Sequence, residues 1–171
     1  NYSLYASYTE IYLPQTAYRD TRNKMLEPDE GTNYELGLKG EFYDGRLNAS
    51  LAYFEVHEEN RAESDLTFTG TTLVDNPYKG ITAKTKGYEA EISGELAPGW
   101  QLQAGYTHKI IRDETGAKVS TWEPEDQVNF YTTYKLTGPW DKLTLGGGAR
   151  WQGEGWQMLN NPAKRTTDRF S

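Results

Sequence analysis

Two glutamates, Glu35 and Glu89, stand at matching positions in the sequence. Each directly follows a tyrosine, in the triplets Asn-Tyr-Glu and Gly-Tyr-Glu, and each opens a segment where charged and apolar residues alternate. A carboxylate in such a place can accept charge-assisted hydrogen bonds from a guanidinium group, and the pair stabilises only when its hydrogen bonds are complete. The alternative for both is a solvated acid on a charged face. Glu91 competes with Glu89, because alternation puts the two on the same face.

Patterns typical of catalysis or metal binding are missing from the sequence. The two histidines, His57 and His108, stand alone, and the acidic pairs Glu58-Glu59 and Asp113-Glu114 lack the spacing of a calcium loop. There is no cysteine, so thiolate metal sites and disulfides are ruled out. No Ser-His-Asp arrangement with supporting turn residues is visible. We therefore expect no enzyme activity, and no metal or cofactor held by the side chains of the protein.

The elements that position these residues are predicted by a period-two alternation. In residues 33–42 every second residue from Tyr34 is apolar or small, and three of those between are charged. A strand places alternate side chains on opposite faces, so one face is apolar and the other charged. The same alternation occurs in segments 1–12, 46–60, 87–96, 100–110, 126–136 and 142–152. The sequence thus predicts an all-β fold of seven antiparallel strands in an up-and-down meander.

The predicted connections are of two kinds, and they alternate along the chain. The short ones are residues 43–46, 97–99 and 137–142, and the long ones are residues 13–32, 57–86, 112–126 and 153–171. Connections that long are uncommon in compact domains unless they have a function. We expect the functional loops at one end of the sheet.

One part of the third strand breaks the pattern. Phe54 and Val56 fall on the charged face, whereas Glu55 falls on the apolar face. A β-bulge within residues 54–59 would restore the alternation, and we expect one there.

Composition limits the partners of the protein. The chain of 171 residues carries a formal net charge of −7, with an isoelectric point near 4.9, which argues against a nucleic-acid partner. Mean hydropathy is −0.84, and no run of 18 apolar residues exists, so no transmembrane helix is predicted. A membrane β-barrel needs an apolar residue only at every second position of a strand. The first residues of this chain already have the pattern of a strand, so we expect the chain to be a piece of a longer protein.

Two interpretations of the apolar face remain. A soluble β-sheet binding module, such as an adhesin or a sugar-binding domain, would pack two such faces together. Tyr34 to Phe42 spans roughly 27 Å, however, whereas soluble strands average about five or six residues. Aromatic residues also lie near the ends of the apolar faces, where the interfacial girdles of a membrane barrel belong. These features favour lipid against the apolar face.

Four segments carry a resemblance to a known family: LEPDEGTNYELGLKGEF, GRLNASLAYFEVHEENRA, KGYEAEISGELAPGWQLQAGYTH and WDKLTLGGGARWQ. In order and spacing they resemble the TonB-dependent ferric-siderophore receptors of the bacterial outer membrane. The family fold is a 22-stranded transmembrane β-barrel that encloses an N-terminal plug. The resemblance implies that residues 1–171 are part of the barrel domain, at roughly the thirteenth to nineteenth strands, with the plug and the remaining strands absent.

The resemblance also implies a function. The intact receptor would bind a ferric siderophore at its extracellular side and import it in a TonB-dependent, energised step. Iron would be carried within the cargo. The other partners would be TonB, through the absent N-terminal segment, and the lipid and lipopolysaccharide of the outer membrane. Haem and cobalamin remain alternative cargoes, because no residue points physically to a siderophore.

Site residues follow from the same resemblance. Glu35 and Glu89 match the motif positions of two barrel glutamates that pair with plug arginines and hold the plug in place. Siderophore pockets in the family are lined by tyrosine and tryptophan, which offer flat, half-polar contact to a bulky chelate. Candidates in or beside the long loops, or on the charged face, are Tyr5, Tyr12, Tyr18, Tyr78, Trp122, Tyr131 and Trp156. Lys109 and Arg150 would attract an anionic chelate or, alternatively, neutralise neighbouring glutamates.

Overall fold

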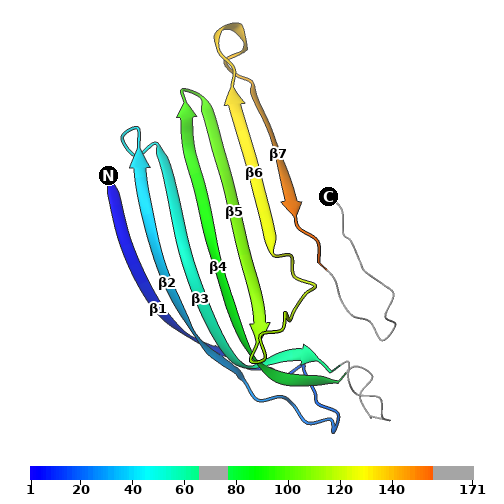
Figure 1. The fold of residues 1–171 in the computed structure, drawn as a ribbon. Coiled ribbons are helices and arrows are strands. Elements are labelled where there is room, and N and C mark those ends of the chain that lie inside the picture. The colour runs from blue at the N-terminus through cyan, green and yellow to red at the C-terminus, as the bar shows by residue number, and fades with distance from the viewer. Residues whose placement is uncertain (66–76, 156–171) are drawn as a thin grey trace.

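The computed structural model describes residues 1–65 and 77–155, and in it one antiparallel sheet carries its strands in chain order (Figure 1). The strands are β1 (Tyr2–Leu13), β2 (Asp29–Phe42), β3 (Leu47–Ser64), β4 (Tyr78–Ala97), β5 (Trp100–Asp113), β6 (Asp126–Lys135) and β7 (Thr144–Gln152). A short 3₁₀ helix, η1 (Gly138–Trp140), lies in the turn between β6 and β7. The predicted seven-stranded meander is therefore confirmed. Within the described ranges, no helix is long or apolar enough to cross a membrane.

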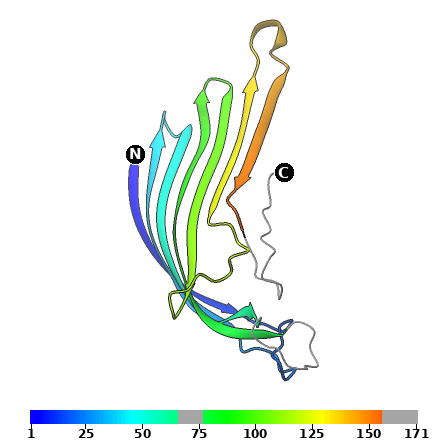
Figure 2. The same cartoon turned by 45° about the vertical axis from the view of Figure 1, so that its right-hand side comes forward.

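The sheet is a single curved layer, concave on one side (Figure 2). Its convex face carries the apolar residues of the alternation, and these side chains remain open: Leu36 is 54% exposed, Leu38 46% and Leu145 56%. In the described part of the chain only Leu47, Ala83 and Ile111 are buried hydrophobic residues. The face-to-face packing that the sandwich interpretation requires is not seen, since no second layer of the described chain packs on this face.

Aromatic side chains frame the convex face in two rows. Towards the long loops lie Tyr8, Tyr34, Tyr53, Tyr88, Tyr106 and Trp151, and towards the short turns lie Tyr2, Phe42, Trp100 and Tyr134. Strand register brings members of a row together, with Tyr8 opposite Tyr34 and Trp100 opposite Tyr134. Between the rows the convex positions are leucine, isoleucine, alanine, glycine, phenylalanine and threonine. An uncharged band between two aromatic rows is typical of the outer surface of a membrane barrel.

Strands β3 and β4 continue well past the predicted ends of their alternation. We expected a loop over residues 57–86, but β3 runs to Ser64 and β4 begins at Tyr78. The register shifts between Glu58 and Arg61, where Asn60 has a φ of 62°. Gly80 lies against this point, and a Cβ on it would approach the Asn60 backbone to 3.2 Å. The far ends of β3 and β4 bend there towards the concave side (Figure 2).

The position predicted for the bulge, within residues 54–59, is wrong, because the register shifts between Glu58 and Arg61. Pairing of β2 with β3 is continuous from Phe42 opposite Leu47 to Glu30 opposite Glu59. Glu55 therefore lies on the convex face, and Phe54 and Val56 on the concave face. Cross-strand partners explain the exception, since Lys84 and Lys86 on β4 both pair with Glu55.

Candidate functional site

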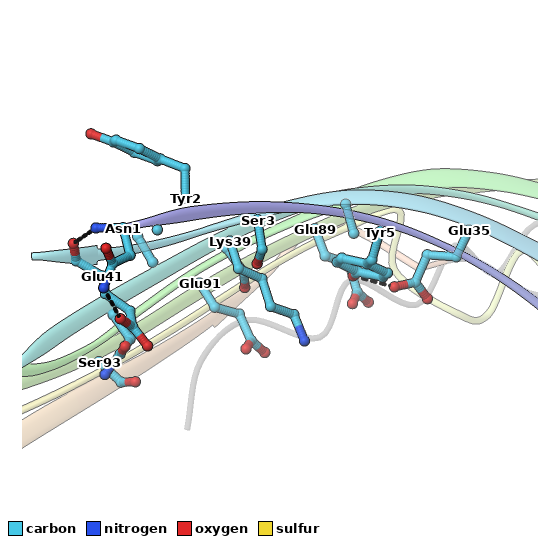
Figure 3. A pocket seen from close by; sticks show the side chains of 15 residues that line it. Asn1, Tyr2, Ser3, Tyr5, Glu35, Lys39, Glu41, Glu89, Glu91 and Ser93 are labelled. Atoms are coloured by element: carbon cyan, nitrogen blue, oxygen red, sulfur yellow. Dashed lines mark hydrogen bonds between the residues drawn. The ribbon is translucent and has the colours of Figure 1, made fainter. Parts of the chain in front are cut away.

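The concave face carries a hollow rich in carboxylates. It is lined from β1, β2, β3 and β4, and its charged side chains are Glu35, Lys39, Glu41, Glu89 and Glu91 (Figure 3). The structure thus brings Glu35 and Glu89 to one surface, as the repeated Tyr-Glu motif predicts. Alternation produces this result, because each glutamate lies one residue beyond a tyrosine of the convex aromatic row. Glu91 lines the hollow as well, so geometry does not separate it from Glu89.

Tyr5 organises the centre of this hollow. Its hydroxyl donates a hydrogen bond to Glu35 Oε1, and the Lys39 Nζ lies 4.7 Å from the centre of its ring. Gly37 is opposite Tyr5 in the register, and a Cβ on Gly37 would collide with the tyrosine ring. The missing side chain lets the ring lie flat over β2 and reach Glu35. Glu89 has a longer contact, 3.5 Å from the Thr107 hydroxyl.

This arrangement is suited to binding a cationic segment. The hollow has a volume of ≈510 Å³ and is open, so it has room for side chains from another part of the protein. Four glutamates face one lysine there, and a carboxylate has more acceptor sites than one phenol hydroxyl can fill. A guanidinium group would find both opposite charge and free acceptors.

A second hollow adjoins the first on the concave side of β4 to β7. It is lined by Glu91, Gln103, Asn129, Tyr131 and Arg150, among others. Tyr131 is 53% exposed. The two candidates Tyr131 and Arg150 therefore share one surface, while Lys109 lies apart from them near the loops.

Lys109 belongs to a network of ion pairs at the loop end of the concave face, here called the mouth network: Glu58, Arg61, Lys109 and Glu123. Arg61 donates to Glu58 at 2.9 Å and to Glu123 at 2.8 Å, with all three side chains at most 18% exposed. Glu123 also accepts from Lys109. The network joins β3 and β5 to the loop that follows β5.

Both neighbouring loops are fixed to this end of the sheet. In the loop 114–125, Ser120 is 3% exposed and its hydroxyl donates to Glu63 at 3.3 Å. In the loop 14–28, Gln15 is 8% exposed and donates to the carbonyl groups of Glu27 and Asn60. The loop end is thus a built structure with its own buried polar contacts.

Asp29 lies beside the mouth network, five residues beyond the aromatic row and outside the apolar band. Burial raises the pKa of its carboxyl; the nearby Glu58 adds to the rise, and Arg61 opposes it. Its Oδ1 has no hydrogen-bond partner in the described chain. No group of three His, Asp or Glu side chains in the described ranges is arranged to hold a metal ion.

The loop aromatic candidates fall in different places. Tyr18 and Tyr78 contact each other, with ring centres 4.7 Å apart, and the Tyr78 amide donates to the Arg19 carbonyl at 2.8 Å. Trp122 is 60% exposed in the loop 114–125. Tyr12 follows the phase of Tyr8 along β1 and so lies on the convex face, away from the other candidates. Trp156 lies outside the described residues.

Sequence reasoning missed the mouth network. Arg61 had no assigned role, and its partner Glu123 is 62 residues away in the chain. The only available signal was the concentration of charge in segments 57–63 and 123–126, which fits a solvated loop equally well. The pairing of Arg61 with Glu123 depends on the bulge near Asn60, and no turn motif in the sequence predicts that bulge.

Replacing Arg61 by methionine should loosen the loop 114–125. The change removes the cation paired with Glu58 and one of the two cations paired with Glu123. The cost should be about 2 kcal/mol, between the values for buried and exposed pairs. The loosening would be measured as faster hydrogen exchange of amides in this loop. One such amide is that of Glu123, which donates to the Ser120 carbonyl at 2.9 Å.

The matched control is methionine at Lys118, whose pair with Glu125 at 2.5 Å is about two-fifths exposed. An exposed pair of this kind contributes at most about 1 kcal/mol, so this variant should exchange much as the parent does. Equal protection in the Arg61 and Lys118 variants would show that the mouth network does not hold the loop.

Comparison with known proteins places this sheet in a family. The family model described as "TonB dependent receptor-like, beta-barrel" matches residues 1–170. The ferripyoverdine receptor of Pseudomonas aeruginosa is 66% identical over 99% of this chain, which covers 21% of that receptor. The ferric-pyoverdine 358 receptor of Pseudomonas putida is 45% identical over 87% of this chain and 18% of that receptor. The chain thus spans about a fifth of the length of these relatives.

Solved structures agree with this assignment. The ferripyoverdine receptor from the outer membrane of P. aeruginosa, crystallised with ferripyoverdine, has a TM-score of 0.76 at 68% identity, with 96% of this chain and 22% of that chain covered. The alcaligin receptor of Bordetella pertussis has a TM-score of 0.67 at 38% identity, with 89% of this chain and 27% of that chain covered. The predicted resemblance is confirmed, and the chain belongs to the TonB-dependent receptor β-barrel family.

Proposed function

We propose that the intact protein is an outer-membrane receptor that binds a ferric siderophore of the pyoverdine class at its extracellular side and imports it with energy delivered through TonB. The observation that carries this proposal is the 66% identity to a ferripyoverdine receptor along 99% of the chain. The loop end faces outward, since barrels of this kind have short periplasmic turns and longer extracellular loops. The receptor does no chemistry on its cargo, and iron enters within the siderophore.

The concave hollow is proposed as the anchor of the plug. Glu35 and Glu89 would each accept a plug arginine, and Tyr5 would hold Glu35 in place through its hydroxyl. Support comes from the excess of carboxylates in the hollow and its open volume. TonB would act through a segment that precedes the barrel, outside this chain.

The loop end of the concave face is proposed as the wall of the siderophore path. Tyr18, Tyr78 and Trp122 lie at the loop end, and Tyr131 lies lower on the concave face. Aromatic rings of this kind give rigid contact to a chelate with both apolar and polar edges. Lys109 forms an ion pair with Glu123, so its proposed role is to neutralise that acid and to fix the loop 114–125. Arg150 remains a candidate for contact with the anionic cargo.

An uptake experiment tests this function. The intact receptor would be expressed in a Gram-negative strain that lacks its own pyoverdine receptors, and cells would be given ⁵⁵Fe-labelled ferripyoverdine. We expect uptake that requires the receptor and disappears when TonB is deleted. Binding of the label without TonB-dependent accumulation, or accumulation of labelled haem instead, would contradict the proposal.

A further inference from the structure

Asp29 is a buried acid that neither the plug anchor nor the siderophore path uses. It is the first residue of β2 and is only 7% exposed, although it lies outside the apolar band. Its Oδ1 is closed to solvent and has no hydrogen-bond partner in the described chain. A charged carboxylate that is buried and incompletely paired is costly, whereas a protonated carboxyl carries no charge and can itself donate a hydrogen bond. A proton would therefore stabilise Asp29 in its present place.

The charged groups beside Asp29 come from β3. Strand register sets Glu58 opposite Gly31, so Glu58 and Asp29 are diagonal neighbours across the two strands. The one cation that acts on Asp29 here is Arg61, which already donates to Glu58 at 2.9 Å and to Glu123 at 2.8 Å. A single guanidinium group thus faces three acids, and Asp29 is the one to which it makes no hydrogen bond.

Asp29 also lies at the base of the loop 14–28. It is opposite Leu13, the last residue of β1, so this pair closes the loop. Next to the pair, Gln15 is 8% exposed and donates to the Asn60 carbonyl at the bulge of β3. Both neighbours on the β1 side are uncharged. From β5, Lys109 pairs with the mouth network and completes the charged groups of this surface.

Burial raises the pKa of the Asp29 carboxyl; the charge of Glu58 adds to the rise, and Arg61 opposes it. The packed loop end therefore binds a proton more tightly than a loosened one, in which water would surround this carboxyl. By linkage, the packed arrangement is favoured most below the ordinary pKa of aspartate, about 3.9. This advantage is lost as the pH rises through the raised pKa.

Charging of Asp29 would loosen the loop end in two ways. The carboxylate can move into water, which opens the base of the loop 14–28. It can also draw Arg61 away from Glu123, and that ion pair joins β3 to the loop 114–125. Either movement relieves the burial of an unpaired charge at the expense of loop contacts.

We infer that Asp29 is a proton-binding switch of the loop end. With a proton on Asp29, the loops 14–28 and 114–125 stay packed against β3 and the mouth network, and without it both loops loosen. The inference does not depend on the proposed function, because it involves only a proton and contacts within this chain.

Hydrogen exchange in the purified intact receptor tests this inference at pH values from about 4 to about 8. Each exchange rate is compared with the intrinsic rate at the same pH, which gives a protection factor. One reporter is the amide of Leu26, which donates to the Tyr18 carbonyl at 3.1 Å. The other is the amide of Val119, which donates to the Ile111 carbonyl at 3.1 Å. Heat-modifiable migration on gels shows that each variant is folded.

The decisive variant is Asp29→Asn, because asparagine has the shape of the protonated acid and cannot ionise. In the parent, we expect the protection of both reporter amides to fall about tenfold from the acid to the alkaline end of this range. That is the size expected when one buried polar group is left without a partner. Asp29→Asn should keep its protection throughout. The control is Glu30→Gln, which removes an exposed acid from the opposite face of β2 and should follow the parent.

Three results would overturn the inference. Constant protection in the parent would show that the loops do not respond to a proton. The same pH dependence in Asp29→Asn as in the parent would assign the response to another group. Lower protection in Asp29→Asn than in the parent at every pH would show that Asp29 acts as a charged partner of Arg61, and not as a proton-binding group.

Discussion

Arginine in place of Leu38 is expected to lower the free energy of unfolding of the intact receptor in a membrane by about 2–4 kcal/mol. Leu38 lies midway between the aromatic rows, since its strand carries Tyr34 at one end of the band and Phe42 at the other. Its side chain is 46% exposed on the convex face. A guanidinium group there would meet hydrocarbon without a partner. Unfolding by guanidinium chloride in lipid vesicles, together with the amount of heat-modifiable receptor in outer membranes, measures the effect.

Arginine at Gln103 is the matched control for this prediction. Gln103 lies on the concave face of β5, beside Glu91 in the second hollow. The same charge should cost less than about 1 kcal/mol there, because the face is polar and already carries ions. If the two arginine variants were equally destabilised, the assignment of the convex face to lipid would be wrong.

The second large effect is expected from replacing Glu35 and Glu89 together by glutamine. Under the proposed function two plug arginines would lose their carboxylates, and removal of one partner from a buried ion pair costs about 3–5 kcal/mol. The plug should then open locally far more often. Hydrogen exchange in the plug of the intact receptor should accelerate, and cells should become sensitive to antibiotics too large for the closed barrel.

Two comparisons sharpen this test. Glu41→Gln removes an acid that lines the same hollow nearer the turn end, and it should leave plug exchange unchanged. A double variant with Glu91→Gln in place of Glu89→Gln decides between the two competing acids. If the plug exchanged hydrogen at the same rate in the variant lacking both Glu35 and Glu89 as in Glu41→Gln, the anchoring role would be excluded.

The fold was predictable wherever apolar and polar residues alternate regularly along a strand. Alternation identified each strand between the aromatic rows, and the turn residues Tyr43 to Arg46, Pro98-Gly99 and Gly138-Pro139 marked the short connections. This works because one face of the sheet meets an apolar medium and the other a polar one, so a register error would invert every side chain. The placement of Glu35 and Glu89 in one hollow followed from the same rule.

Sequence reasoning failed where distant residues compensate for each other. The position of Glu55 in the alternation suggests a bulge, because an acid on an apolar face is costly unless it is paired. Its partners Lys84 and Lys86 lie on the next strand, and only the register shows that they meet it. The alternation also predicts loop at the far ends of β3 and β4, since the bend at Asn60 and Gly80 breaks the alternation without ending the pairing.

Spin-label accessibility can distinguish lipid from water around Leu38 and Lys39 in the intact receptor. A cysteine at each position would carry a nitroxide spin label, and this chain contributes no cysteine of its own to compete for the label. We expect the label at residue 38 to collide with oxygen dissolved in the bilayer and to be shielded from a water-soluble nickel chelate. The label at residue 39 should be shielded from oxygen. Equal oxygen access at both positions, or chelate access at residue 38, would contradict the conclusion that the convex face of this sheet is the lipid-facing wall of the barrel.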